Sequence, residues 1–200
     1  MSGGAWMPLS VHVATWMGVL PLAWLFALSL RGKDHEPQWW WLALAFAVSW
    51  AADETALQFP KPDRWWLTFI FPISQTTIVT RVLWSQRRTF IVLGVLVAAA
   101  LLAVAWEGVR GPDVILYSVA CLCIVGIVWL RPELSFRLRL CLLVYFGLGL
   151  IAWLAHAEWI HEHPHGTAPT WWPYQGARLA GLLLFCWAVM KPGPSLRMVR

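Results

Sequence analysis

Seven apolar stretches, each about as long as a membrane-spanning helix, fill most of this chain, with only short connections between them. An α-helix of about 20 residues crosses the hydrocarbon core of a bilayer. Helices satisfy their own backbone hydrogen bonds there, so runs of this length predict helices. The sequence predicts an all-α fold: a polytopic integral membrane protein that forms a single seven-helix transmembrane domain over residues 1–200. The predicted spans are residues 8–30, 38–55, 65–84, 89–106, 114–130, 135–155 and 171–190.

The composition agrees with a membrane protein and argues against a nucleic-acid partner. The 200 residues are 60% hydrophobic and 12% charged, whereas soluble domains carry about 25% charged residues. The net charge of +5 comes from basic residues at the ends of the spans, where such residues orient a chain in the membrane. Most of the 17 tryptophans also lie near span ends, as in the aromatic belts of membrane proteins. We therefore expect membrane lipid, and no nucleic acid, as a partner.

The basic residues also predict an orientation. Eleven of the 15 Lys and Arg residues lie at one set of span ends. Because cytoplasmic loops carry the excess of positive charge, we expect the N-terminus outside and the C-terminus in the cytoplasm, in the cell (inner) membrane. These eleven residues are Arg31, Lys33, Arg81, Arg87, Arg88, Arg131, Arg137, Arg139, Lys191, Arg197 and Arg200.

Polar residues inside three of the spans form the first candidate site. Polar and ionisable groups are costly within a bilayer, so each is a functional hypothesis. In one interpretation Asp53 and Arg178 form an ion pair between helices, and the other polar groups hydrogen-bond neighbouring helices. In the other, the same groups line an outward-facing cavity that holds a polar head group or a small solute. The candidate ligand-binding residues are Asp53, Glu54, Gln75, Tyr174, Gln175 and Arg178.

A histidine-rich connection before the last span forms the second candidate site. His161, His163 and His165 alternate along it, so in an extended segment they would point to one face. Three imidazoles at one point suit Zn²⁺, Cu²⁺ or Ni²⁺, and Glu162 or Asp53 would then act as a general base. The alternatives are an exposed loop that binds metal only weakly and a pH sensor, because imidazoles titrate near neutral pH.

Three functions follow from these features. The leading one is a ligand-binding or transport-type membrane protein with a polar site open to the outer side. The second is a metal-dependent membrane hydrolase that acts on a lipid-like substrate at the outer leaflet through the histidine cluster. The third is a structural subunit of a membrane complex, in which small residues pack against partner helices. Those small residues are Gly147, Gly149, Gly176, Ala180 and Gly181. Whether the chain is an enzyme stays open at this point.

Overall fold

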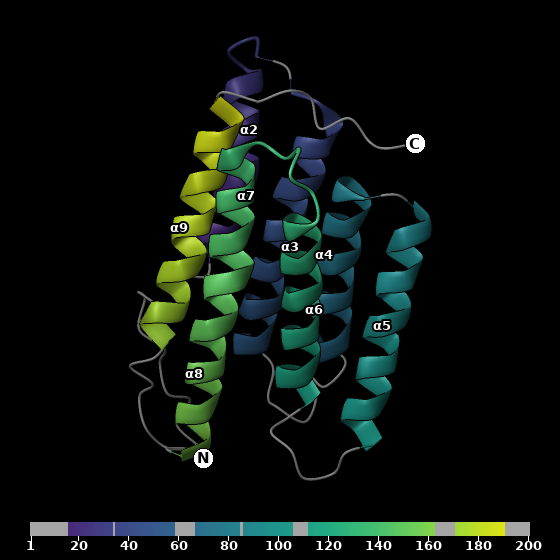
Figure 1. The fold of residues 1–200 in the computed structure, drawn as a ribbon. Coiled ribbons are helices and arrows are strands. Elements are labelled where there is room, and N and C mark those ends of the chain that lie inside the picture. Colours follow the sequence, from purple (N-terminus) through teal and green to yellow (C-terminus); the bar gives the residue numbers. More distant parts are fainter. Residues whose placement is uncertain are drawn as a thin grey trace.

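The computed structural model describes residues 16–33, 35–58, 67–84, 86–105, 112–162 and 171–190. Within these ranges the regular structure is entirely helical, which confirms the predicted all-α fold (Figure 1). It forms seven helices when the continuous helical run of residues 136–162 is counted as one. Each helix lies within or overlaps one of the seven predicted spans. The elements are the 3-10 turn η1 (Met17–Val19), the helices α2 (Leu20–Ser29), α3 (Pro37–Gln58), α4 (Leu67–Leu83), α5 (Gln86–Ala105), α6 (Pro112–Trp129) and α7 (Phe136–Leu142), the π-helical turn η3 (Leu143–Leu148), and the helices α8 (Gly149–Glu162) and α9 (Trp171–Met190).

The sixth helix is a composite of α7, η3 and α8. It begins after Ser135, whose hydroxyl accepts a hydrogen bond from the backbone N–H of Leu138 as an N-cap. It continues to Glu162, beyond the predicted boundary at residue 155. The residues that follow His156 are compatible with a helix, and Pro164 disfavours helical backbone only at the residue before it. His156 therefore lies inside this helix, one residue beyond the predicted end of the span.

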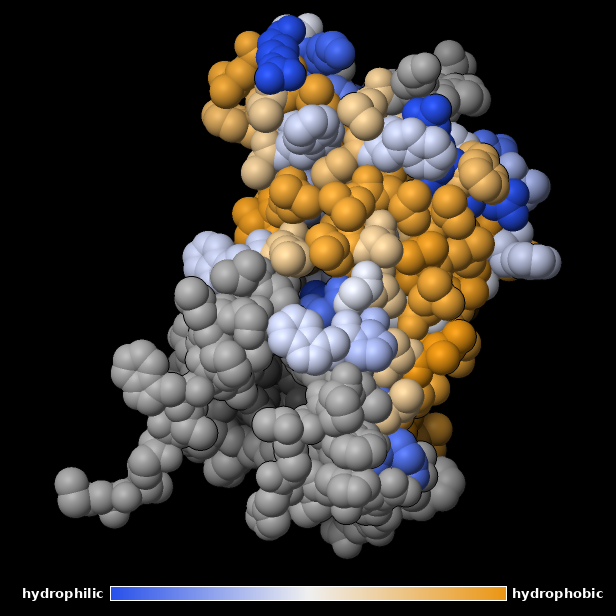
Figure 2. Space-filling model, turned by 90° about the vertical axis from the view of Figure 1, so that its left-hand side faces the viewer, coloured by the Kyte–Doolittle hydropathy of each residue, from blue (hydrophilic) through white to orange (hydrophobic). Residues whose placement is uncertain are grey.

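The described surface carries a wide apolar area, which Figure 2 shows between the hydrophilic upper end and the lower part of the molecule. Among the described residues, one helix, Phe136–Glu158, is both long and apolar enough to cross a membrane, and Met17–Ser29 and Val114–Trp129 are shorter apolar helices. Helix α5 presents large apolar side chains outward along its length. These side chains are Phe90, Ile91, Val95, Val97, Leu101 and Leu102.

Basic side chains gather at one end of the bundle, which we call the basic end. Helices α2, α4, α6 and α9 end there, and α3, α5 and α7 begin there (Figure 1). The strongly hydrophilic residues at the top of Figure 2 lie at this end. The described basic residues in or beside these helix ends are Arg31, Lys33, Arg81, Arg87, Arg88, Arg131, Arg137 and Arg139.

Helices α3 and α9 and the turn η3 meet in an aromatic core. The ring of Phe46 on α3 lies with its centroid 4.6 Å from that of Tyr145 and 5.3 Å from that of Phe185 on α9. Gly181 lets α9 approach the backbone of η3. A Cβ atom at this position would lie 2.6 Å from the Cβ and 2.9 Å from the Cα of Tyr145. Gly181, expected to face a partner helix, therefore makes a close contact inside the chain.

Arg131 connects two helix ends at the basic end. Its Nη1 donates a hydrogen bond to the carbonyl oxygen of Leu83 at the end of α4, and its guanidinium forms an ion pair with Glu133. A backbone hydrogen bond, and then the charge of Arg131, hold the pKa of the Glu133 carboxyl below its usual value.

Arg131→Ala is expected to lower the free energy of unfolding by about 1–2 kcal/mol, because a helix-terminal carbonyl loses a charged donor. Detergent-induced unfolding followed by circular dichroism measures this. Glu133→Gln is the control and should leave the unfolding free energy unchanged, because Glu133 is exposed and exposed ion pairs contribute little. Equal losses in both variants would contradict the role given to the Leu83 carbonyl.

Candidate functional site

The described structure holds a buried guanidinium, that of Arg178 on α9, and ties it to two other helices. Arg178 is 4% exposed. Its Nη2 donates to the hydroxyl of Ser49 on α3 at 2.8 Å and to that of Tyr145 in η3 at 3.1 Å. Its Nε also reaches the Tyr145 hydroxyl, at 3.2 Å. The guanidinium carbon lies 5.6 Å from the ring centroid of Tyr145 and 5.3 Å from that of Tyr174, within the range of cation–π contacts.

The position of this group along the bundle follows from helix geometry. Ser49 lies 12 residues after the start of α3 and Arg178 lies 12 residues before the end of α9. At 1.5 Å per residue, both lie about 18 Å from the basic end. In an apolar layer about 30 Å thick, this is slightly beyond the middle and nearer the opposite end. Figure 2 shows a recess at mid-height of the molecule with a hydrophilic residue inside it.

Aromatic side chains from α6, α8 and α9 surround one side of the arginine. The ring centroid of Trp153 lies 5.6 Å from that of Tyr117, 5.8 Å from that of His156 and 5.4 Å from that of Tyr174. The rings of His156 and Tyr174 are nearly parallel, with centroids 6.5 Å apart. His156 and Tyr174 are both buried. Arg178 and these rings together form what we call the arginine–aromatic site.

Two polar atoms of this site have no nitrogen or oxygen hydrogen-bond partner within the described part of the chain, although the Tyr117 hydroxyl lies close to the weakly hydrogen-bonding thiol of Cys121. They are the hydroxyl oxygen of Tyr117 and the indole Nε1 of Trp153, and both are buried. Tyr117 lies within electrostatic range of Arg178 as well as of Tyr145 and Tyr174. Buried polar atoms in proteins are nearly always hydrogen-bonded. These two atoms beside a guanidinium are therefore candidates for hydrogen bonds to a polar ligand or to water.

The structure brings several of the predicted residues to this region. Tyr174 and Arg178 are in contact, and Gln175 is buried beside Tyr174 in the sequence. Gln75 on α4 is buried, and its Nε2 donates to the carbonyl oxygen of Ala45 at 3.0 Å. Ala45 lies one helical turn before Ser49 on α3. The bond made by Gln75 therefore fixes α4 against the segment of α3 that contacts Arg178.

For Asp53 and Glu54 the structure describes the backbone in α3 but not the side chains. Asp53 follows Ser49 by four residues, and residues with this spacing share one face of a helix. Since Ser49 contacts Arg178, helix geometry is compatible with the predicted pair of Asp53 and Arg178. The pair itself, and any role of Glu54, stay predictions.

The predicted metal site lies mostly outside the described residues. His161 belongs to the last turn of α8, but its side chain is not described, and His163 and His165 lie in the segment 163–170 beyond it. Among the side chains that the structure describes, no group of three or more His, Cys, Asp or Glu could hold a metal ion. The Zn²⁺, Cu²⁺ or Ni²⁺ site stays a prediction.

Sequence reasoning missed the aromatic part of the site. The chain has three tyrosines, and all three lie at this site: Tyr117, Tyr145 and Tyr174. Of these, only Tyr174 was predicted, because it lies close to Arg178 in the sequence. The signal available for Tyr145 was its place in the middle of a predicted span, away from the interfaces that usually hold tyrosine; Tyr117 lies near the start of its predicted span and carried no such signal.

Comparison with known proteins does not assign the chain to a family. No protein-family model, no curated protein and no solved structure matches it. Its function must therefore be inferred from the arrangement of its own side chains.

Proposed function

We propose that this chain is an integral membrane protein of the cell (inner) membrane that binds or transports a small anionic amphiphile in the arginine–aromatic site. The proposal places all seven helices across the membrane, with the N-terminus outside and the basic end in the cytoplasm. The apolar surface of α5 and the collection of basic side chains at one end support this placement. At about 18 Å from the basic end, the site is nearer the outer side, from which the ligand would enter.

The chemistry of the ligand follows from the groups that surround the site. A guanidinium recognises carboxylate and phosphate groups better than an ammonium does, because its planar donors match their geometry. Hydrogen bonds to Ser49 and Tyr145 hold Arg178 in one orientation. The rings of Trp153 and Tyr174 provide an apolar wall, with the donors on Tyr117 and Trp153 for further polar atoms. A carboxylate or phosphate attached to a short apolar body fits this combination.

The observation that carries the proposal is the buried cation at a site where neighbouring polar atoms lack nitrogen or oxygen partners. Here, Tyr145 and Ser49 position the guanidinium, while Tyr117 and Trp153 present hydrogen-bonding atoms with no nitrogen or oxygen partner among the described residues.

The test is the thermal stability of the protein, purified in a neutral detergent, with three probes of equal chain length. Octanoate and octyl phosphate carry an anionic group, and octanol does not. At about 100 times its dissociation constant a ligand stabilises the folded state by about 2.7 kcal/mol, a rise in Tm of roughly 5–10 °C for a chain of this size. We expect this rise with at least one anionic probe and not with octanol.

Two variants make the result specific. Arg178→Gln should lose the response to the anionic probe, and Arg87→Gln, at an exposed position of the basic end, should keep it. The proposal is wrong if octanol stabilises the protein as much as the anions do, or if Arg178→Gln responds like the natural protein.

A further inference from the structure

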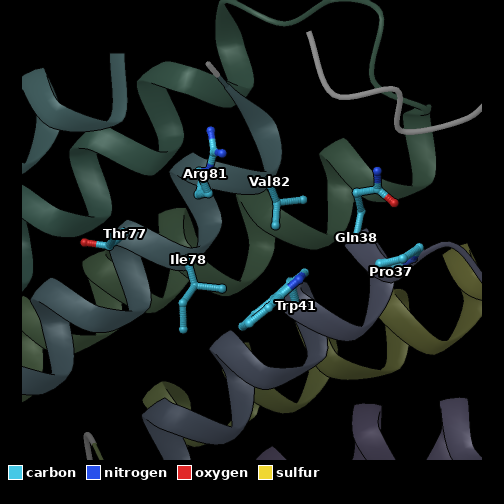
Figure 3. A pocket seen from close by; sticks show the side chains of 7 residues that line it. All are labelled: Pro37, Gln38, Trp41, Thr77, Ile78, Arg81 and Val82. Carbon is cyan, nitrogen blue, oxygen red and sulfur yellow. The ribbon is translucent and has the colours of Figure 1, made fainter. Parts of the chain in front are cut away.

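A second cavity lies at the basic end, away from the arginine–aromatic site. It has a volume of about 330 Å³ and lies between the first turns of α3 and the last turns of α4. Figure 3 shows Trp41 and Ile78 extending toward the space between the two helices, with Arg81 and Gln38 nearer the end of the bundle. We call this cavity the α3–α4 groove. Its volume is in the lower part of the range of small-molecule sites.

The lining of the groove is apolar with two polar groups. Trp41 is 54% exposed, and Ile78 and Val82 line the wall formed by α4. The exposed guanidinium of Arg81 forms no ion pair with a side chain that the structure describes. The side-chain oxygen of Gln38 is buried and accepts no hydrogen bond from described residues. The groove therefore offers a cation, a free acceptor and an apolar surface together.

These groups are ordered by depth. Arg81 lies two residues before the end of α4, and Gln38 lies one residue after the start of α3. Ile78 lies about one turn further from the basic end than Arg81, and Trp41 is displaced from Gln38 in the same direction. A phospholipid has the same order, with its phosphate at the interface and its acyl chains deeper. Anionic lipids are also attracted to a surface that carries many basic residues.

We propose that the α3–α4 groove binds one anionic glycerophospholipid from the leaflet at the basic end. Its phosphate contacts Arg81, and the start of one acyl chain packs on Trp41 and Ile78; a rotation of the Gln38 side chain would bring its oxygen within reach of a head-group hydroxyl. This inference rests on the membrane placement in the proposed function, but not on the ligand proposed for the arginine–aromatic site.

Native mass spectrometry of the full chain in a neutral detergent tests the proposal. The protein is titrated with phosphatidylglycerol, which is anionic, and with phosphatidylcholine of the same acyl chains, which is zwitterionic. We expect the first molecule of phosphatidylglycerol to bind about five- to tenfold more tightly, the effect of one well-placed basic residue near a membrane surface. Equal affinities for the two lipids would overturn the proposal.

Variants locate the bound lipid. Arg81→Gln should remove the preference for phosphatidylglycerol, and Arg81→Lys should retain part of it because the charge is kept. Arg87→Gln is the matched control, since Arg87 is exposed at the same end but does not line the groove. The groove is not the site if Arg81→Gln keeps the full preference or if Arg87→Gln loses as much.

The same titration separates this proposal from the ligand proposed for the arginine–aromatic site. Arg178→Gln should bind phosphatidylglycerol like the natural protein, whatever its response to octanoate. A chain that is soluble and monodisperse without detergent would contradict the membrane placement itself, and with it the lipid proposal.

Discussion

Replacing Gly181 with alanine is expected to lower the free energy of unfolding by about 1–3 kcal/mol, the usual cost of an extra methyl group in a packed interior. The new Cβ would lie 2.9 Å from the Cα and 2.6 Å from the Cβ of Tyr145. Neither atom is the end of a flexible side chain, so relief requires α9 and η3 to move apart. The measurement is unfolding in mixtures of a neutral and an anionic detergent, followed by circular dichroism.

Gly176→Ala is the matched control, because Gly176 lies on the same helix and a Cβ there would meet nothing within 4 Å. Alanine favours a helix over glycine by about 1 kcal/mol, so this variant should be unchanged or slightly more stable. If both glycine variants lost the same stability, the close approach of α9 to Tyr145 would not be the cause.

The Gly181 variant should also affect the arginine–aromatic site. Tyr145 accepts hydrogen bonds from Arg178 at 3.1 and 3.2 Å, so a shift of its backbone by several tenths of an ångström would lengthen both. We therefore expect Gly181→Ala to weaken the binding of an anionic probe although Gly181 itself does not need to touch the ligand. Gly176→Ala should leave that binding unchanged.

Replacing Arg178 with glutamine is expected to cost about 3 kcal/mol of unfolding free energy. A hydrogen bond from a charged donor contributes about 1.5–3 kcal/mol, and the partners left behind become buried and unsatisfied. Both Ser49 and Tyr145 lose their donor. The unfolding free energy of Arg178→Lys should lie between those of the natural protein and of Arg178→Gln, because an ammonium keeps the charge but lacks the planar set of donors of a guanidinium. The same detergent unfolding measures all these variants.

Tyr145→Phe is the control for this prediction, since it removes the hydroxyl and keeps the ring that packs on Phe46. It should cost about 1–2 kcal/mol. In the double variant of Arg178→Gln and Tyr145→Phe, the losses should be smaller than additive, because both single changes break the same hydrogen bonds. Strict additivity would show that these bonds contribute nothing to stability.

Much of the helical fold could be predicted because length and hydropathy suffice to recognise long apolar helices. The end of the sixth helix was placed too early, because a histidine-rich segment has the composition of a loop. The segment after His156 nevertheless continues the helix to Glu162, because it contains no residue that breaks a helix before Pro164. Gly181 was predicted to pack against a partner helix, whereas in the structure it lies against Tyr145 of the same chain. A single sequence does not reveal whether the neighbour of a small residue is another protein or the same chain.

The candidate site was predictable only where polarity is unusual along the chain. Arg178 and Gln75 stood out because each is polar inside an apolar span, and both are buried. Tyr145 did not stand out, since its ring suits an apolar environment and its partner is 33 residues away. The contact also depends on the π-helical turn, which no periodic pattern in the sequence indicates.

The turn η3 has a consequence for the angular order of the sixth helix. A π turn takes about one residue more than an α turn for the same rotation, and each residue of an α-helix advances about 100°. A helical wheel drawn continuously through Phe136–Glu162 would therefore misplace the side chains of α8 by about 100° around the helix axis relative to those of α7. The sixth helix is, in angular terms, two helices with a fixed phase offset. Removing one residue from η3 would hardly shorten the helix. It would nevertheless change the angle around the helix axis between the side chains of Tyr145 and Trp153.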